Sequence, residues 1–216
     1  MTDADFFAVV HAQRAYREFT DAPVDDETIA RILDAAVRAP SAENKQPWEF
    51  VVVRDERTRA AIGALMTRAW ETAGRAFSRD RIPAAMLAEV ERGFTGGIAA
   101  APVHVVVGAD THRGLGATAA ESIYPAVQNL LLAAAAVGLG SALTTIALGY
   151  GAELRALVDL PEHVKPMAVV PIGHPTRRLG PSRRDSFAVH THRERYGTPW
   201  DPTVGSGPGQ GPVGSV

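Results

Sequence analysis

The sequence predicts an α+β fold in which helices pack around a small central β-sheet. Short apolar runs, typical of buried strands, alternate with longer segments that carry apolar residues at helical spacing. The strand-like runs are few and the helical segments are many, which indicates a small sheet. The 216 residues suit one domain, expected over 1–197, followed by a flexible tail over 198–216 that contains five glycines and four prolines.

The first two helices are predicted from spacing and end signals. Residues 3–13 carry apolar side chains at helical intervals. Asp25 or Asp26 can cap a second helix, since short acidic side chains accept hydrogen bonds from the first turn. The apolar positions of this second helix continue to Val37, and Pro40 closes it.

The next stretch contains one strand and a long helical region. Residues 50–53 have no polar face, which predicts a central strand. Residues 56–77 are rich in alanine and helical in pattern. Residues 78–97 match no pattern well enough for an assignment, because Pro83 and the Gly96-Gly97 pair interrupt them.

The second half again alternates strands with helices. The run at 103–107 predicts a strand, and 115–139 predicts a long helix that Gly138 and Gly140 end. Pro125 lies inside this helix and implies a kink or a restart at Ser122. A strand or extended connector, a short helix and a third strand are then predicted at 141–147, 152–158 and 167–172.

Composition and charge exclude several classes of function. The formal net charge of −2 provides no global field for nucleic acid or an anionic membrane. The absence of cysteine excludes disulfides, thiolate nucleophiles and cysteine-ligated metal centres. The acidic N-terminus lacks the pattern of a signal peptide. The apolar window at 130–143 is shorter than the roughly 20 residues that a helix needs to cross a bilayer. We therefore expect a cytoplasmic protein that binds neither nucleic acid nor membrane.

Several familiar motifs are incomplete. The Gly-x-Gly fragments at 114–116 and 138–140 lack the third glycine and the preceding strand of a dinucleotide fold. His190 and His192 are too few ligands for a metal site and have arginine neighbours. No Gly-x-Ser-x-Gly occurs, which disfavours a serine hydrolase.

The loop between the second helix and the first strand carries short hydrogen-bonding side chains on irregular backbone. Ser41, Asn44 and Gln46 precede the Pro47-Trp48 turn. Such a segment can bind a flat polar ligand through hydrogen bonds. An ordinary turn between a helix and a strand would have a similar sequence.

Two pairs of arginines could bind an anion. Arg14 and Arg17 are three positions apart, and Arg183 and Arg184 are adjacent near the C-terminus. Guanidinium groups suit a phosphate monoester, which carries close to two negative charges. The alternative is solvated surface charge.

Together these segments resemble the FMN-dependent nitroreductase family over residues 6–196. The most specific match is Ala-Pro-Ser-Ala-Glu-Asn-Lys-Gln-Pro-Trp at 39–48. The others are Gln-Arg-Ala-Tyr-Arg-Glu-Phe at 13–19, the apolar segments at 127–134 and 138–141, and 170–175 followed by Arg183-Arg184.

The resemblance implies a domain completed by dimerisation, with two FMN sites at the subunit interface. One subunit would supply Gln13, Arg14, Ala15, Arg17, Arg183 and Arg184, and the other would supply Pro40, Ser41, Ala42 and Asn44. Thr144, Thr145 and Ile146 would lie along the isoalloxazine ring, with Leu143 as a further contact. The sequence departs from the family at Gln13 and Ala15, which replace an arginine and a serine, and 68–97 matches nothing assignable.

The resemblance also implies a reaction. Hydride from NADH or NADPH would reach flavin N5, and two electrons would pass to a small electrophile such as a nitroaromatic or quinone in the same pocket, with ping-pong kinetics. Arg17 would stabilise the reduced ring near N1 and O2. No protein acid or base is strictly required, because the flavin carries the redox chemistry. The same fold could instead serve dehalogenation, azoline oxidation or flavin cleavage, or a flavin-binding protein without catalysis.

Overall fold

A computed structural model describes residues 3–114, 116–180 and 182–200. The chain forms two compact units, Met1–Pro181 and Ser182–Val216. The first unit contains a four-stranded antiparallel sheet with the order β1-β2-β4-β3. The strands are β1 (Trp48–Val53), β2 (Val103–Asp110), β3 (Gly140–Ser141) and β4 (Val164–Gly173).

Helices and short helical turns make up most of the remaining regular structure, as the α+β prediction requires. The α-helices are α1 (Asp3–Ala12), α2 (Asp26–Ala36), α3 (Glu56–Ala69), α4 (Arg75–Arg79), α5 (Ala84–Arg92), α6 (Ala119–Ala136) and α7 (Gly151–Leu157). Short 3-10 or π-helical turns are η1 (Ala42–Asn44), η2 (Trp70–Gly74), η3 (Gly93–Gly97), η4 (Gly116–Thr118), η5 (Ile146–Tyr150) and η6 (Phe187–His190).

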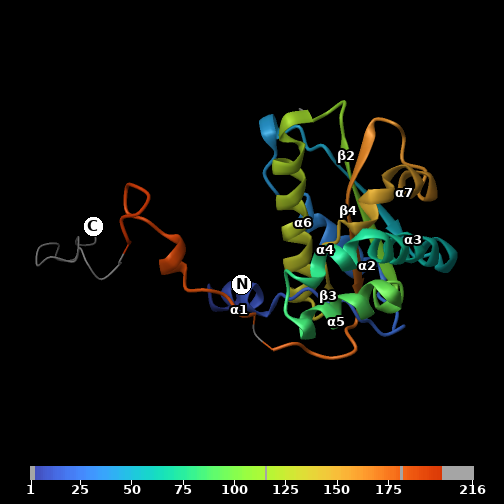
Figure 1. Cartoon of the computed structure of the whole chain (residues 1–216). Coiled ribbons are helices and arrows are strands. Elements are labelled where there is room, and N and C mark those ends of the chain that lie inside the picture. Colours follow the sequence, from blue (N-terminus) through green and yellow to red (C-terminus); the bar gives the residue numbers. More distant parts are fainter. Residues whose placement is uncertain (1–2, 115, 181, 201–216) are drawn as a thin grey trace, which may run out of the picture. The chain divides into compact units, whose positions relative to one another are not determined.

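Helices cover both faces of the sheet (Figure 1). Side chains of a strand point alternately to opposite faces, so neighbouring valines of β2 join different clusters. Val105 packs in the cluster that contains α2 and α6, whereas Val106 packs with α3 and α7. All eight residues of β2 are buried for this reason.

The prediction of a central strand at 50–53 is wrong, because β1 lies at the edge of the sheet beside β2. The missing polar face has another cause. Trp48 and Phe50 pack in the α2–α6 cluster, while Val51 and Val53 pack in the α3–α7 cluster. An edge strand that is covered on both faces thus has the same apolar pattern as a central strand.

The ends of two helices agree with local sequence signals. Of the two predicted capping residues, Asp25 caps α2 and accepts from the backbone N–H of Thr28 at 2.7 Å and from its hydroxyl at 2.9 Å. These hydrogen bonds hold the pKa of Asp25 below its ordinary value. Gly138, with a φ of 79°, follows the end of α6 as predicted.

The restart predicted at Ser122 does not occur. Helix α6 is continuous over 18 residues, with Pro125 inside it. Proline removes the hydrogen bond to the carbonyl four residues earlier, here that of Glu121. Glu121 is exposed near the start of the helix, where water can replace that bond.

Helix α6 also contains the first half of the apolar window at 130–143. Leu130, Leu131 and Ala134 are buried against the sheet and α2. Among the described residues, no helix combines the length and the apolarity that a membrane span requires.

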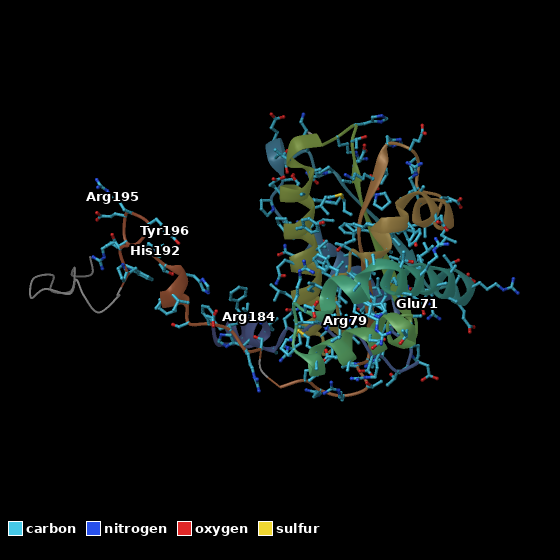
Figure 2. The ribbon with its side chains drawn as sticks, in the orientation of Figure 1. Glu71, Arg79, Arg184, His192, Arg195 and Tyr196 are labelled. Carbon is cyan, nitrogen blue, oxygen red and sulfur yellow. The ribbon has the colours of Figure 1, made fainter. Side chains whose placement is uncertain are left out.

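The second unit contains η6 and two aromatic contacts. The rings of Phe187 and Trp200 have centroids 5.9 Å apart. The ring centroids of His192 and Tyr196, both labelled in Figure 2, are 4.5 Å apart. Most of the predicted tail, from residue 201 onward, lies outside the described residues.

A histidine is fully buried in β2. His104 is 0% exposed, and its Nε2–H donates to the carbonyl of Ile98 at 2.9 Å. Burial lowers the pKa of His104 to about 4, because the imidazolium would lose its hydration, and nearby Arg59 acts in the same direction. His104 is therefore neutral at pH 7.

This burial predicts a pH-dependent stability. The unfolded chain binds a proton at His104 near pH 6.5, whereas the folded chain does so only near pH 4. The free energy of unfolding should therefore fall by up to about 3 kcal/mol as the pH drops from 6.5 to 4. His104→Gln retains a hydrogen-bond donor for the Ile98 carbonyl but has no imidazole to protonate. It should therefore remove this contribution to the pH dependence of the unfolding free energy, measured by urea titrations at several pH values between 6.5 and 4. Exposed His11→Gln is the control, and equal slopes for His104→Gln and wild type would contradict the assignment.

Candidate functional site

The loop predicted to grip a ligand has an unusual and self-bonded backbone. Glu43, Asn44 and Gln46 have φ values of 52°, 55° and 49°, in the left-handed region that side chains rarely adopt. The Ser41 hydroxyl accepts from the Gln46 N–H at 3.0 Å, and the Gln46 amide donates to Asn44 Oδ1 at 3.1 Å. Left-handed residues cost free energy and tend to occur at functional sites, so the local geometry fits a binding loop.

One buried hydroxyl ties this loop to the core. The Ala42 N–H donates to the Oγ of Ser122 on α6 at 3.1 Å, and Ser122 donates to the Thr118 carbonyl at 3.2 Å. Ser122 is 2% exposed. Sequence reasoning assigned no role to this contact, although a serine among the buried residues of an apolar helix is a signal for a specific partner.

A second predicted segment lies at the other edge of the sheet. Thr144 is buried, and it exchanges two backbone hydrogen bonds with Val169 of β4, at 3.0 and 2.9 Å. Leu143 and Thr145 are exposed on either side of it, and Ile146 is half-buried. This pairing fixes the turn that the resemblance places along the isoalloxazine ring.

The N-terminal arginine segment runs beside the same edge. Ala15 forms a parallel bridge with Ser141 of β3, and the Tyr16 N–H donates to the Ser141 carbonyl at 3.0 Å. Residues 13–17 are half-buried. Because the 143–146 turn follows Ser141 almost directly, the fold brings together two segments that are about 125 residues apart in sequence.

The two arginines of this segment have different partners. The Arg17 guanidinium lies 3.2 Å from Glu89 of α5 and donates to the Ala15 carbonyl at 3.4 Å. Glu89 also lies 3.6 Å from Arg177. Arg14 donates to the carbonyl of Gly180. The previously unassigned region thus supplies the anionic partner of Arg17.

The same region builds an open cavity of about 530 Å³ beside Ile146. Its wall includes Ala69, Ala73, Gly74, Phe77 and Tyr150. A Cβ at Gly74 would lie 2.9 Å from the Trp70 ring and 3.0 Å from Ile146, so the close packing of this wall requires glycine. The segment from Glu71 to Arg79, whose ends are labelled in Figure 2, therefore forms one side of a mostly apolar pocket next to a predicted flavin contact.

The predicted contacts lie at opposite ends of α6. The loop at 40–44 meets Ser122 in the first turns of the helix, whereas Ala15 and the 143–146 turn meet Ser141, just beyond its last turn (Figure 1). The helix from Ser122 to Ala136 alone spans roughly 21 Å at 1.5 Å per residue. The first unit therefore brings the contacts together in two separate groups.

Arg183 and Arg184 belong to the second unit (Figure 2). Both are exposed, and with Asp185 and His190 they line a hollow of about 360 Å³. Arg184 donates to the Arg183 carbonyl at 2.8 Å. Their contact with a phosphate stays a prediction.

We expect Ser122→Ala to loosen the loop. It removes the acceptor of the Ala42 N–H and the bond to Thr118, which should cost about 1 kcal/mol of unfolding free energy and increase hydrogen exchange at Ala42. Thr95→Ala is the matched control, because Thr95 makes the same bond to a carbonyl four residues earlier without touching the loop. Unchanged exchange at Ala42 in Ser122→Ala would mean that the hydroxyl does not hold the loop.

The fold and the two groups of predicted contacts define a class of α+β proteins that carry a loop with left-handed residues at one end of a central helix and a basic segment at the other. The family model described as the nitroreductase family matches residues 10–174. The chain belongs to the nitroreductase family.

Individual relatives agree with this membership. A Methanothermobacter thermautotrophicus protein provisionally named NADH dehydrogenase/NAD(P)H nitroreductase is 31% identical over 189 residues, which cover 85% of this chain and 83% of the relative. A provisionally named nitroreductase from Desulfovibrio desulfuricans, solved in complex with FMN, is 27% identical with a TM-score of 0.69 over 90% of this chain and 99% of the other. The 5,6-dimethylbenzimidazole synthase of Rhodospirillum rubrum is 37% identical over 142 residues, 62% of this chain and 65% of that protein.

Proposed function

We propose that two copies of this chain form a cytoplasmic homodimer that binds FMN at the interface and transfers two electrons from NADH or NADPH to a small electrophilic acceptor, such as a nitroaromatic or a quinone. The chain is an NAD(P)H-dependent FMN oxidoreductase by its family and by relatives that carry NAD(P)H nitroreductase names or bound FMN. The acceptor, the ping-pong mechanism, the dimer and the cytoplasmic location are the proposed parts.

The separation along α6 is the observation that carries the dimer. An isoalloxazine ring beside the 143–146 turn cannot reach a loop that lies more than roughly 21 Å away in the same copy. A second copy can supply its own loop, with Pro40, Ser41, Ala42 and Asn44, to the first copy's arginine segment. The contacts that the family resemblance assigns to one flavin then come from two chains.

An exposed apolar helix also supports an interface. Phe6, Phe7 and Val10 of α1 are 47%, 57% and 40% exposed. Helix α1 directly precedes the arginine segment, so a partner that covers these side chains would lie next to the proposed flavin site. Exposed apolar side chains gathered on one helix are typical of a surface that is buried in an assembly.

The residues at the arginine end fit the chemistry of FMN. The flavin, when bound, supplies the redox chemistry, accepting hydride from the nicotinamide and giving up two electrons. Arg17 would provide positive charge at N1 and O2, and its bond to Ala15 holds the guanidinium over its own segment. Arg14, with Arg184 and Arg183, would bind the phosphate, while Gln13 keeps a hydrogen-bonding amide without charge.

The apolar cavity fits a flat acceptor. Phe77, Ile146 and Tyr150 provide aromatic and aliphatic walls. The Arg68 guanidinium lies 3.8 Å above the Tyr150 ring and bonds to Glu153 at 2.5 Å, which fixes one side of the wall. A nitroaromatic or quinone ring would stack in this pocket, next to the turn proposed to contact the flavin.

A different reaction on the same scaffold is the second candidate. It is favoured by the 37% identity to a 5,6-dimethylbenzimidazole synthase and by the departures at Gln13 and Ala15. An enzyme of this alternative kind would bind FMN but would not pass electrons from NAD(P)H to a panel of nitroaromatics and quinones.

Four measurements on the purified full chain test the proposal. After incubation with FMN and gel filtration, the protein should keep a flavin spectrum and sediment as a dimer. Anaerobic mixing with NADH or NADPH should bleach the flavin, and an acceptor should restore it, with parallel double-reciprocal plots. A protein that stays colourless, a strictly monomeric species, or a flavin that neither nicotinamide bleaches would each contradict the corresponding part.

The ion pair of Arg17 and Glu89 predicts that substitutions of its two members shift the flavin reduction potential in opposite directions. Arg17→Ala should weaken FMN binding roughly 10- to 100-fold, because a charged hydrogen bond is lost, and should lower the flavin reduction potential. Glu89→Gln removes the opposing charge 3.2 Å from Arg17 and should raise the potential. Arg79→Ala, at an exposed position of α4, is the control for a general loss of charge. An unchanged potential and affinity in Arg17→Ala would exclude Arg17 from the site.

A further inference from the structure

Three possible metal ligands gather where β2 ends and β4 begins. Asp110 is the last residue of β2, His112 follows two residues later, and His163 directly precedes β4. One ligand atom of each lies within 4.8 Å of the other two. The antiparallel register, which pairs Asp110 with Val164, brings these sequence-distant residues together.

Backbone hydrogen bonds hold the three positions in place. The N–H and the hydroxyl of Thr111 both donate to the His163 carbonyl at 2.8 Å. The His112 N–H donates to Asp110 Oδ1 at 2.7 Å, and the Asp110 N–H donates to the Pro47 carbonyl at 2.7 Å. The cluster is therefore built by the fold, and little backbone ordering would remain for a ligand to impose.

The side chains suit a transition metal ion. The two imidazole rings lie face to face, with centroids 4.3 Å apart and planes 7° from parallel. Ligand atoms about 2.0–2.2 Å from a tetrahedral Zn²⁺ are about 3.4 Å from one another. To bind one ion, the two rings must turn out of this stack so that a nitrogen lone pair of each points at the metal. Because His112 is exposed and His163 is half-buried, both side chains have room to turn.

We propose that Asp110, His112 and His163 form a binding site for a divalent transition metal ion, Zn²⁺ in particular, with water as the remaining ligand. Two imidazole nitrogens and one carboxylate oxygen favour zinc over the oxygen-seeking Mg²⁺ and Ca²⁺. The site shares no residue with the proposed flavin contacts. A bound ion would link the end of β2 to the start of β4.

The positive charge of Arg113 lies beside Asp110 and should weaken the binding of a metal cation, which can be tested by substitution. The Arg113 Nε lies 3.3 Å from Asp110 Oδ2, and its guanidinium also lies 3.8 Å from Glu49. Removal of this cation frees a carboxylate oxygen and takes away a like charge. Arg113→Ala should therefore bind Zn²⁺ several-fold more tightly than wild type.

The full chain, stripped with a chelator and dialysed, is titrated calorimetrically with ZnCl₂ and with MgCl₂, and with CoCl₂ under visible spectroscopy. We expect one Zn²⁺ per chain, a higher unfolding temperature, tetrahedral Co²⁺ bands and no response to Mg²⁺. His112→Ala and His163→Ala should each weaken binding at least about tenfold while circular dichroism stays unchanged.

The C-terminal histidines provide the decisive control. His190→Ala/His192→Ala removes the two histidines that are two positions apart near the C-terminus and should leave the affinity as in wild type. No saturable binding to wild type, wild-type affinity in both His112→Ala and His163→Ala, or loss of binding in the C-terminal double variant would each overturn the proposal.

Discussion

The buried pairing of β2 with β4 is the constraint on which the rest of the first unit depends. Both strands are covered by helices, so their polar backbone groups must bond to each other. Val169 lies at the centre of this arrangement, because it pairs with Val106 on one side and exchanges bonds with Thr144 on the other. The turn proposed to face the flavin is therefore held by β4, which is buried throughout from residue 167 to residue 173.

This arrangement explains how a rigid sheet can carry several irregular segments. The arginine segment joins β3 at Ser141, and the loop at 40–44 joins α6 at Ser122. Each attachment uses backbone groups or a short hydroxyl, whose positions vary little. Side chains that must meet a ligand are then left on loops, where their identity can change without loss of the core.

Local signals in the sequence predicted what depends on near neighbours. Asp25 caps a helix through Thr28, and Gly138 ends one through its own backbone, so both were predictable. The edge position of β1 could not be predicted. Trp48 and Val53 are buried by helices on opposite faces of the sheet, and no local sequence pattern reveals those helices. The same limit applies to the site: its family motifs were visible in the sequence, but the pairing of Arg17 with Glu89 joins residues 72 positions apart.

The length of α6 has a consequence for the symmetry of the proposed dimer. If the loop of one copy meets the arginine segment of the other, a two-fold axis makes the reverse contact identical, and two equal sites result. A head-to-tail contact would use one loop and leave the partner's loop open to a further copy. Because the two contact groups lie at opposite ends of one helix, the α6 helices of a two-fold dimer would run side by side in opposite directions, with one site at each end. The exposed side chains of α1 lie at the arginine end, so each site would also be sealed by an apolar contact.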